Sequence, residues 1–86
     1  MDIEYRKAAD GEWTVCRDGQ RIGRVILVDE GGSVVVKYID EARLLAQHSC
    51  GIMDAVVGKQ RGWEEKVERA VCGIVQLVDL VLAEMV

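Results

Sequence analysis

The dipeptide Asp18-Gly19 restricts the fold of this chain more than any other feature of its sequence. It separates two runs in which apolar and polar residues alternate, and both of its residues accept the positive φ angles of a tight type I′ hairpin turn. A two-residue turn also sets the register of the strands that it joins, because a shift by one residue would exchange their faces. The sequence therefore predicts a β-hairpin in which Val15 lies opposite Ile22 and Trp13 lies opposite Arg24.

Alternating runs and turn residues continue on both sides of this hairpin. The glycine-containing segments 8–11 and 29–32 have the composition of turns. An antiparallel meander is therefore expected, in which each strand pairs with the next one in the sequence. The expected sheet occupies residues 1–39, and its three or four strands lie within residues 3–6, 12–17, 21–28 and 33–39.

The second half of the chain changes from a two-residue period to the helical period. In the segment 40–58, Leu44, Ile52 and Val56 belong to an apolar set that recurs at steps of about three and four, and Asp40 before them is a suitable N-cap. The same period predicts another helix over residues 63–86. The expected fold is one compact α+β domain over residues 1–86. A three- or four-stranded antiparallel β-meander is followed by two α-helices packed on the sheet, at 40–58 and 63–86.

The charge balance and the apolar segments limit the classes of protein that need consideration. Lys and Arg number 11 and Asp and Glu number 15, and the resulting net charge of −4 excludes a strongly basic nucleic-acid arm. The first residues are polar, unlike a signal peptide. The apolar stretch 72–86 is shorter than the roughly 20 residues that span a bilayer. A cytoplasmic protein is therefore expected.

The cysteines and the histidine are the candidate metal ligands and nucleophiles. Cys16, Cys50 and Cys72 are odd in number and widely spaced, so separate reduced thiols are expected rather than a disulfide framework. His48 and Cys50 would point about 200° apart on a helix, which disfavours both a zinc site and a Cys–His nucleophilic pair. The sequence therefore predicts no enzyme, no metal site and no cofactor. A small Cys/His metal protein or enzyme remains as an alternative hypothesis.

A second alternative is a nucleic-acid-binding accessory protein that uses the basic residues of the hairpin. A sheet can present basic and aromatic side chains to a nucleic-acid strand. Arg17, Arg21, Arg24 and Lys37 are the candidates, but acidic residues are interspersed among them. The predicted register also divides these four residues between two faces of the sheet, so direct binding of nucleic acid is not the favoured hypothesis.

The predicted fold leaves apolar residues uncovered, because the two helices can cover only one face of the sheet. Both faces of the expected sheet are apolar near residues 25–28 and 34–36, and the last predicted helix has only a narrow polar strip. For so small a chain, a second copy is favoured to cover this surface, and the alternative is that the helix predicted over residues 40–58 covers it within one chain. The sequence therefore predicts a homodimer, whose interface is formed by Val75, Leu77, Leu80 and Leu82.

These observations favour a non-enzymatic protein-binding module, an inhibitor or an adaptor that acts by occupying the surface of a partner. In size and acidic composition the chain resembles small phage- and prophage-encoded inhibitors of host defence, such as anti-CRISPR proteins. This resemblance implies that the partner is a CRISPR effector or another nucleic-acid-handling complex. Charged residues at hairpin edges commonly tune recognition. The predicted contact residues are Glu12, Arg17, Asp18, Arg21, Asp29 and Glu30.

Overall fold

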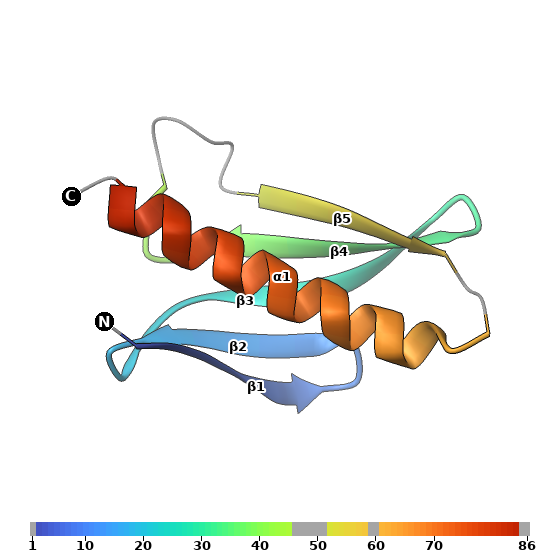
Figure 1. Ribbon diagram of the computed structural model, residues 1–86, viewed down its shortest axis with the longest axis horizontal. Helices are drawn as coiled ribbons and strands as arrows, with labels where there is room; N and C mark the ends of the chain where they lie inside the picture. The colour runs from blue at the N-terminus through green and yellow to red at the C-terminus, as the bar shows by residue number, and fades with distance from the viewer. Residues whose placement is uncertain (1, 46–51, 59–60, 85–86) are drawn as a thin grey trace.

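The computed structural model describes residues 2–45, 52–58 and 61–84 and shows a five-stranded antiparallel sheet with one helix on it (Figure 1). Each strand pairs with its neighbours in sequence, in the order β1-β2-β3-β4-β5. The elements are β1 (Ile3–Ala9), β2 (Glu12–Arg17), β3 (Gln20–Glu30), β4 (Ser33–Asp40), β5 (Ile52–Gly58) and α1 (Trp63–Glu84). The predicted α+β class and the β-meander are confirmed, with five strands in place of three or four.

The helix predicted over residues 40–58 is wrong for the part of this segment that the structure describes. Asp40 does accept hydrogen bonds from the backbone N–H groups of Ala42 and Leu45, at 3.1 and 2.8 Å. Arg43, however, has a φ of 57°, which lies in the left-handed region and breaks a right-handed helix. Residues 52–58 then form β5, which pairs antiparallel with β4. Residues 46–51, which include His48 and Cys50, lie outside the described residues.

A β-bulge corrects the predicted register of the hairpin. The turn itself is confirmed, because Asp18 and Gly19 have φ angles of 53° and 79°. Beyond the turn the register shifts between Val15 and Cys16, so that Val15 pairs with Gly23 and not with Ile22. Trp13 consequently pairs with Val25 and not with Arg24. The bulge exchanges the predicted faces of β3, since one extra residue in a strand reverses the alternation beyond it.

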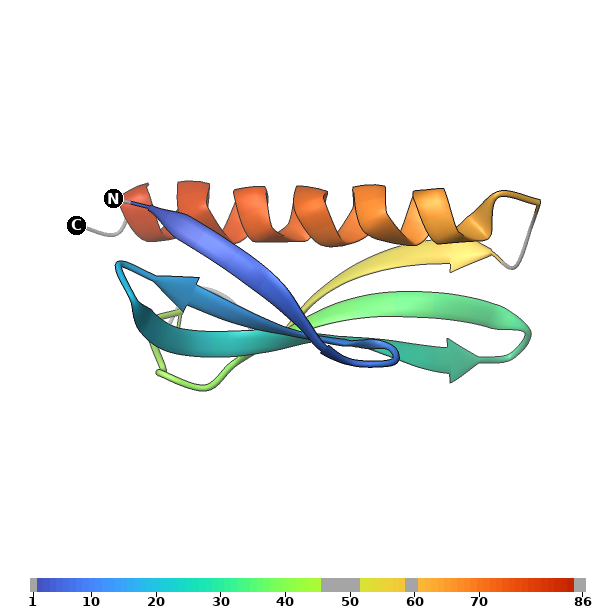
Figure 2. The same ribbon diagram turned by 90° about the horizontal axis from the view of Figure 1, so that it is seen from below.

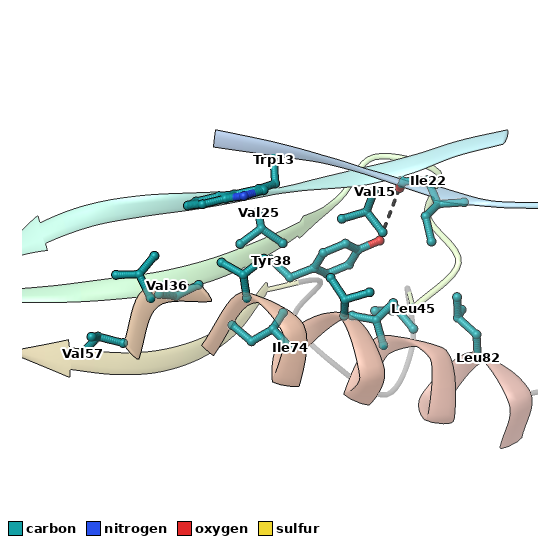
Figure 3. Close-up of a cluster of buried hydrophobic side chains, with 14 residues drawn as sticks. Trp13, Val15, Ile22, Val25, Val36, Tyr38, Leu45, Val57, Ile74 and Leu82 are labelled. Carbon is teal, nitrogen blue, oxygen red and sulfur yellow. Dashed lines mark hydrogen bonds between the residues drawn. The ribbon is translucent and has the colours of Figure 1, made fainter. Parts of the chain in front are cut away.

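The core lies between α1 and the face of the sheet on which α1 packs (Figures 2 and 3). Its buried members are Trp13, Val15, Ile22, Val25, Val36, Tyr38 and Val57 from the sheet, Leu45, and Val67, Val71, Ile74, Val75, Val78 and Leu82 from α1. The long periodic segment after residue 62 therefore forms a helix as predicted, and its apolar stripe covers the sheet. We call this side of the sheet the helix face.

Tyr38 is the one large polar side chain in this core and is only 1% exposed. Its hydroxyl group donates a hydrogen bond to the backbone carbonyl of Ile22, 3.4 Å away (Figure 3). Burial, together with the nearby carboxylates of Asp40 and Glu41, raises the pKa of Tyr38 well above its ordinary value. The neutral phenol therefore links β4 to the bulged part of β3.

Candidate protein-binding surfaces

The face of the sheet that points away from α1 carries an apolar row near one end. Val28 pairs with Val35, and Val35 pairs with Val56, so the three valines lie side by side on β3, β4 and β5. Their neighbours Val36 and Val57 point toward α1, and strand alternation therefore places the row on the opposite face. Val56 is 71% exposed, more than any other large hydrophobic residue of the described chain. We call Val28, Val35 and Val56 the valine row.

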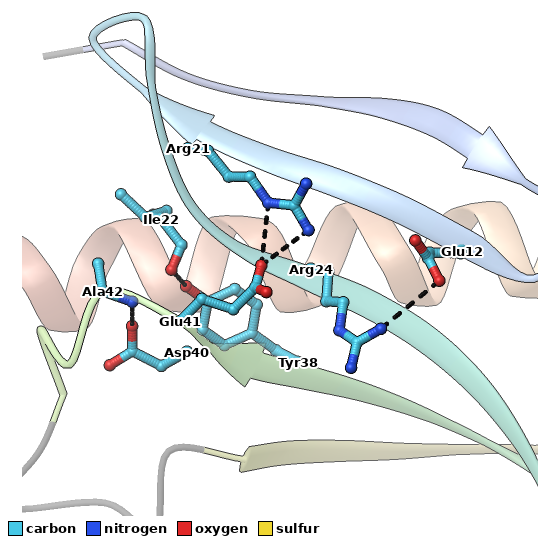
Figure 4. A network of polar contacts seen from close by, with 8 residues as sticks. All are labelled: Glu12, Arg21, Ile22, Arg24, Tyr38, Asp40, Glu41 and Ala42. Atoms are coloured by element: carbon cyan, nitrogen blue, oxygen red, sulfur yellow. Dashed lines mark hydrogen bonds and ion pairs between the residues drawn. The ribbon is translucent and has the colours of Figure 1, made fainter.

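Charged pairs lie beside the valine row on the same face of the sheet. Lys37 Nζ is 3.2 Å from Glu30 Oε1. Arg24 Nη1 is 3.7 Å from Glu12 Oε1, as Figure 4 shows. Pairs exposed to this degree contribute about 0–1 kcal/mol to stability, so they do little to hold the fold together. An apolar row with charged groups beside it makes this face a candidate binding surface, since binding surfaces commonly have an apolar centre and a polar rim.

The six charged residues predicted as one contact surface are spread over the length of the sheet. Arg17, Asp18 and Arg21 lie at the β2–β3 turn, whereas Asp29 and Glu30 lie at the other end of β3. The nine residue steps from Arg21 to Glu30 correspond to about 30 Å of strand. The structure therefore brings these residues together as two groups, with Glu12 beside Arg24 between the ends of β3.

Asp18 and Arg21 at the β2–β3 turn connect the hairpin to other parts of the chain. The backbone N–H of Asp2 donates to Asp18 Oδ1 at 3.0 Å, and the backbone N–H of Asp18 donates to the carbonyl of Asp2 at 2.9 Å. Arg21 reaches Glu41, with 2.9 Å between Nη2 and Oε1 (Figure 4). These contacts attach the N-terminal segment and the segment after β4 to the hairpin.

The four residues predicted for the dimer interface lie on two sides of α1. Val75 and Leu82 are buried against the sheet of the same chain, so a second copy does not reach them in this fold. Leu77 and Leu80 are 48% and 62% exposed. Leu77 and Leu80 are therefore the exposed large apolar residues of α1 that another molecule can contact.

The homodimer prediction consequently depends on these two leucines. Burial of an exposed leucine contributes about 1.5–3 kcal/mol, so their pairing with a second copy would stabilise a dimer. We expect light scattering to give twice the chain mass for the native protein and the single chain mass for Leu77→Lys/Leu80→Lys. A native protein that scatters as one chain at micromolar concentration would contradict the dimer.

The two cysteines in the described part of the chain are free thiols, both half-buried. Cys72 on α1 accepts a hydrogen bond from Gln76 Nε2 at 3.6 Å and also interacts with the hydroxyl group of Tyr5 on β1. Burial first, and then Cys72 and Glu68, raise the pKa of Tyr5. No group of three His, Cys, Asp or Glu side chains among the described residues is placed to hold a metal ion.

Serine in place of Cys16 or Cys72 is expected to preserve the fold and partner binding. The change is nearly isosteric and neither thiol is fully buried, so each substitution should reduce the free energy of unfolding by about 1 kcal/mol or less. Denaturant unfolding and partner binding of each variant measure the two effects. Loss of binding by a folded Cys72→Ser variant would contradict a structural role for this thiol.

Comparisons with known proteins give no indication of the function of this chain, so a proposal must rest on its fold and its surface. No family model, no curated protein and no solved structure matches the chain. Within the described ranges, no helix has both the length and the apolar composition that a membrane span requires.

Proposed function

We propose that this protein is a non-enzymatic protein-binding module, an inhibitor or adaptor that occupies the surface of a partner protein. The valine row carries the proposal, because it places the exposed Val56 and the half-buried Val28 on either side of the buried Val35 on a regular, hydrogen-bonded sheet. The helix covers only the other face of that sheet (Figure 2). A rigid surface loses little conformational entropy on binding, which favours recognition by strands over recognition by loops.

The resemblance to phage-encoded inhibitors of host defence gives this proposal its most specific form. In that form the protein acts in the cytoplasm on a CRISPR effector or another nucleic-acid-handling complex. It blocks one surface of that complex without a cofactor or a chemical step. The mixed charges around the valine row fit such a role, because paired charges at a rim restrict which partners fit.

The pairing of the basic residues supports a protein partner over direct binding of nucleic acid. Arg24 and Lys37 lie on the face that carries the valine row, and each has a glutamate within 4.0 Å. A surface that neutralises phosphates needs unpaired cations, and its affinity falls steeply with salt. Arg24 and Lys37 are therefore already balanced by carboxylates.

Capture from nuclease-treated host lysate tests the proposed function. The immobilised protein should retain the same multi-subunit complex before and after the nucleic acid is digested, since the contact is with protein. Retention that disappears after digestion would overturn the proposal in favour of nucleic-acid binding. Stoichiometric zinc or thiol-dependent turnover in the purified protein would overturn it in favour of a metal protein or an enzyme.

A further inference from the structure

A groove on the helix face, separate from the valine row, runs between the β1–β2 hairpin and the first half of α1. Its deepest part is a hollow of about 440 Å³. Leu27 and Val67 contribute apolar surface to this hollow, and Glu64 and Glu68 of α1 border it. The same two glutamates also border a shallower depression next to Tyr5. We refer to the hollow and this depression together as the groove.

Aromatic residues are concentrated in this groove. The chain has two tryptophans, two tyrosines and no phenylalanine. Trp63 and Tyr5 line the groove with half-buried side chains, and Trp13, which is only 4% exposed, lies at its base. The fourth aromatic residue, Tyr38, is buried in the core. The face of an aromatic ring attracts a cation placed over it, and tryptophan attracts it most strongly.

The charge of the groove is negative. Lys7 is 3.7 Å from Asp10, so this pair is close to neutral. Glu65 and Arg69 also border the depression next to Tyr5, and their opposite charges offset each other. Glu64 and Glu68 form no ion pair within the described part of the chain. The helix N-terminus contributes about half a positive charge, which is less than the two full negative charges of these carboxylates. The electrostatic field in the hollow therefore favours a cation.

We infer that this groove binds an arginine side chain presented by a partner protein. The apolar stem of the arginine would lie on Leu27 and Val67, and its guanidinium group would meet Trp63 and the carboxylates of Glu64 and Glu68. Arginine suits the groove better than lysine, because a planar guanidinium group stacks on an aromatic ring and also bridges two carboxylates. This contact is additional to the valine row, and it does not depend on that surface.

Titration with acetylated hexa-arginine amide at low ionic strength tests the inference, with tryptophan fluorescence and calorimetry as readouts. Loss of two partly exposed ion pairs should weaken binding by Glu64→Gln/Glu68→Gln about tenfold. Glu4→Gln/Glu84→Gln removes the same net charge outside the groove and should change the affinity less than about twofold. Hexa-lysine amide should bind the native protein more weakly than the arginine peptide.

The two double variants separate a local site from the general field of an acidic protein. If both double variants bind the peptide more weakly by the same factor, binding depends on net charge alone and the inferred site is wrong. Unchanged affinity in Glu64→Gln/Glu68→Gln, with circular dichroism confirming its fold, would also overturn it. Because the probe is a free peptide, neither result depends on whether the valine row binds a partner.

Discussion

Gly23→Ala is expected to destabilise the protein by about 3 kcal/mol, although it adds a single methyl group. Gly23 is buried in β3 beside the bulge. A Cβ atom at this position would lie 2.6 Å from Tyr38 Oη and closer still to the backbone oxygen of Ile39. The backbone of β4, which is paired with β3 and β5, cannot move without disturbing its pairing on both sides, and Tyr38 is held by its hydrogen bond to Ile22. A loss of this size is a large part of the about 5–15 kcal/mol that stabilises a typical domain.

Gly73→Ala is the matched control for this substitution, because it adds the same methyl group to an exposed position of α1. No atom lies within 4 Å of a Cβ built at Gly73. Alanine in a helix interior is favoured over glycine by about 0.5–1 kcal/mol, so the control should raise the melting temperature by a few degrees. Thermal unfolding followed by circular dichroism compares the two variants. A Gly23→Ala protein that melts with the native one would contradict the packing of Tyr38 against β3.

The sequence signals that proved reliable are the local ones. Asp18-Gly19 determined its own turn, because the turn depends on the φ angles of those two residues. A helix over residues 63–86 was predicted from a long apolar period, which no strand of comparable length imitates, and the structure shows it as Trp63–Glu84. The bulge at Val15 and Cys16 was not predictable, since the close packing of Gly23 under Tyr38 is a contact between distant residues.

β5 and the candidate surface on it were missed for the same physical reason. The steps from Ile52 to Val56 fit a helix as well as a strand when a run is short. Pairing with β4 decides for the strand, and β-branched valines favour that choice. Val56 was therefore assigned to the apolar set of a predicted helix, whereas it lies on a strand and is the most exposed large hydrophobic residue in the described chain. The valine row exists only because β5 pairs with β4 in the same sheet.

Lysine at two positions of the valine row, in Val28→Lys/Val56→Lys, is expected to weaken partner binding by about 100-fold or more, because it forces two charges into an apolar contact. The fold should persist, since Val56 is 71% exposed and Val28 is half-buried. Gln20→Lys/Ala42→Lys is the matched control. It adds the same two charges at exposed positions near the β2–β3 turn, at the other end of the sheet.

The affinity of these proteins for the purified captured complex, measured by calorimetry, tests the proposed use of the valine row most directly. We expect the native protein and Gln20→Lys/Ala42→Lys to bind with similar dissociation constants, and Val28→Lys/Val56→Lys to bind about 100-fold more weakly or not at all. Circular dichroism of each variant checks the fold. Native affinity in folded Val28→Lys/Val56→Lys, together with a loss in the control, would contradict the account and move the contact to the hairpin end of the sheet.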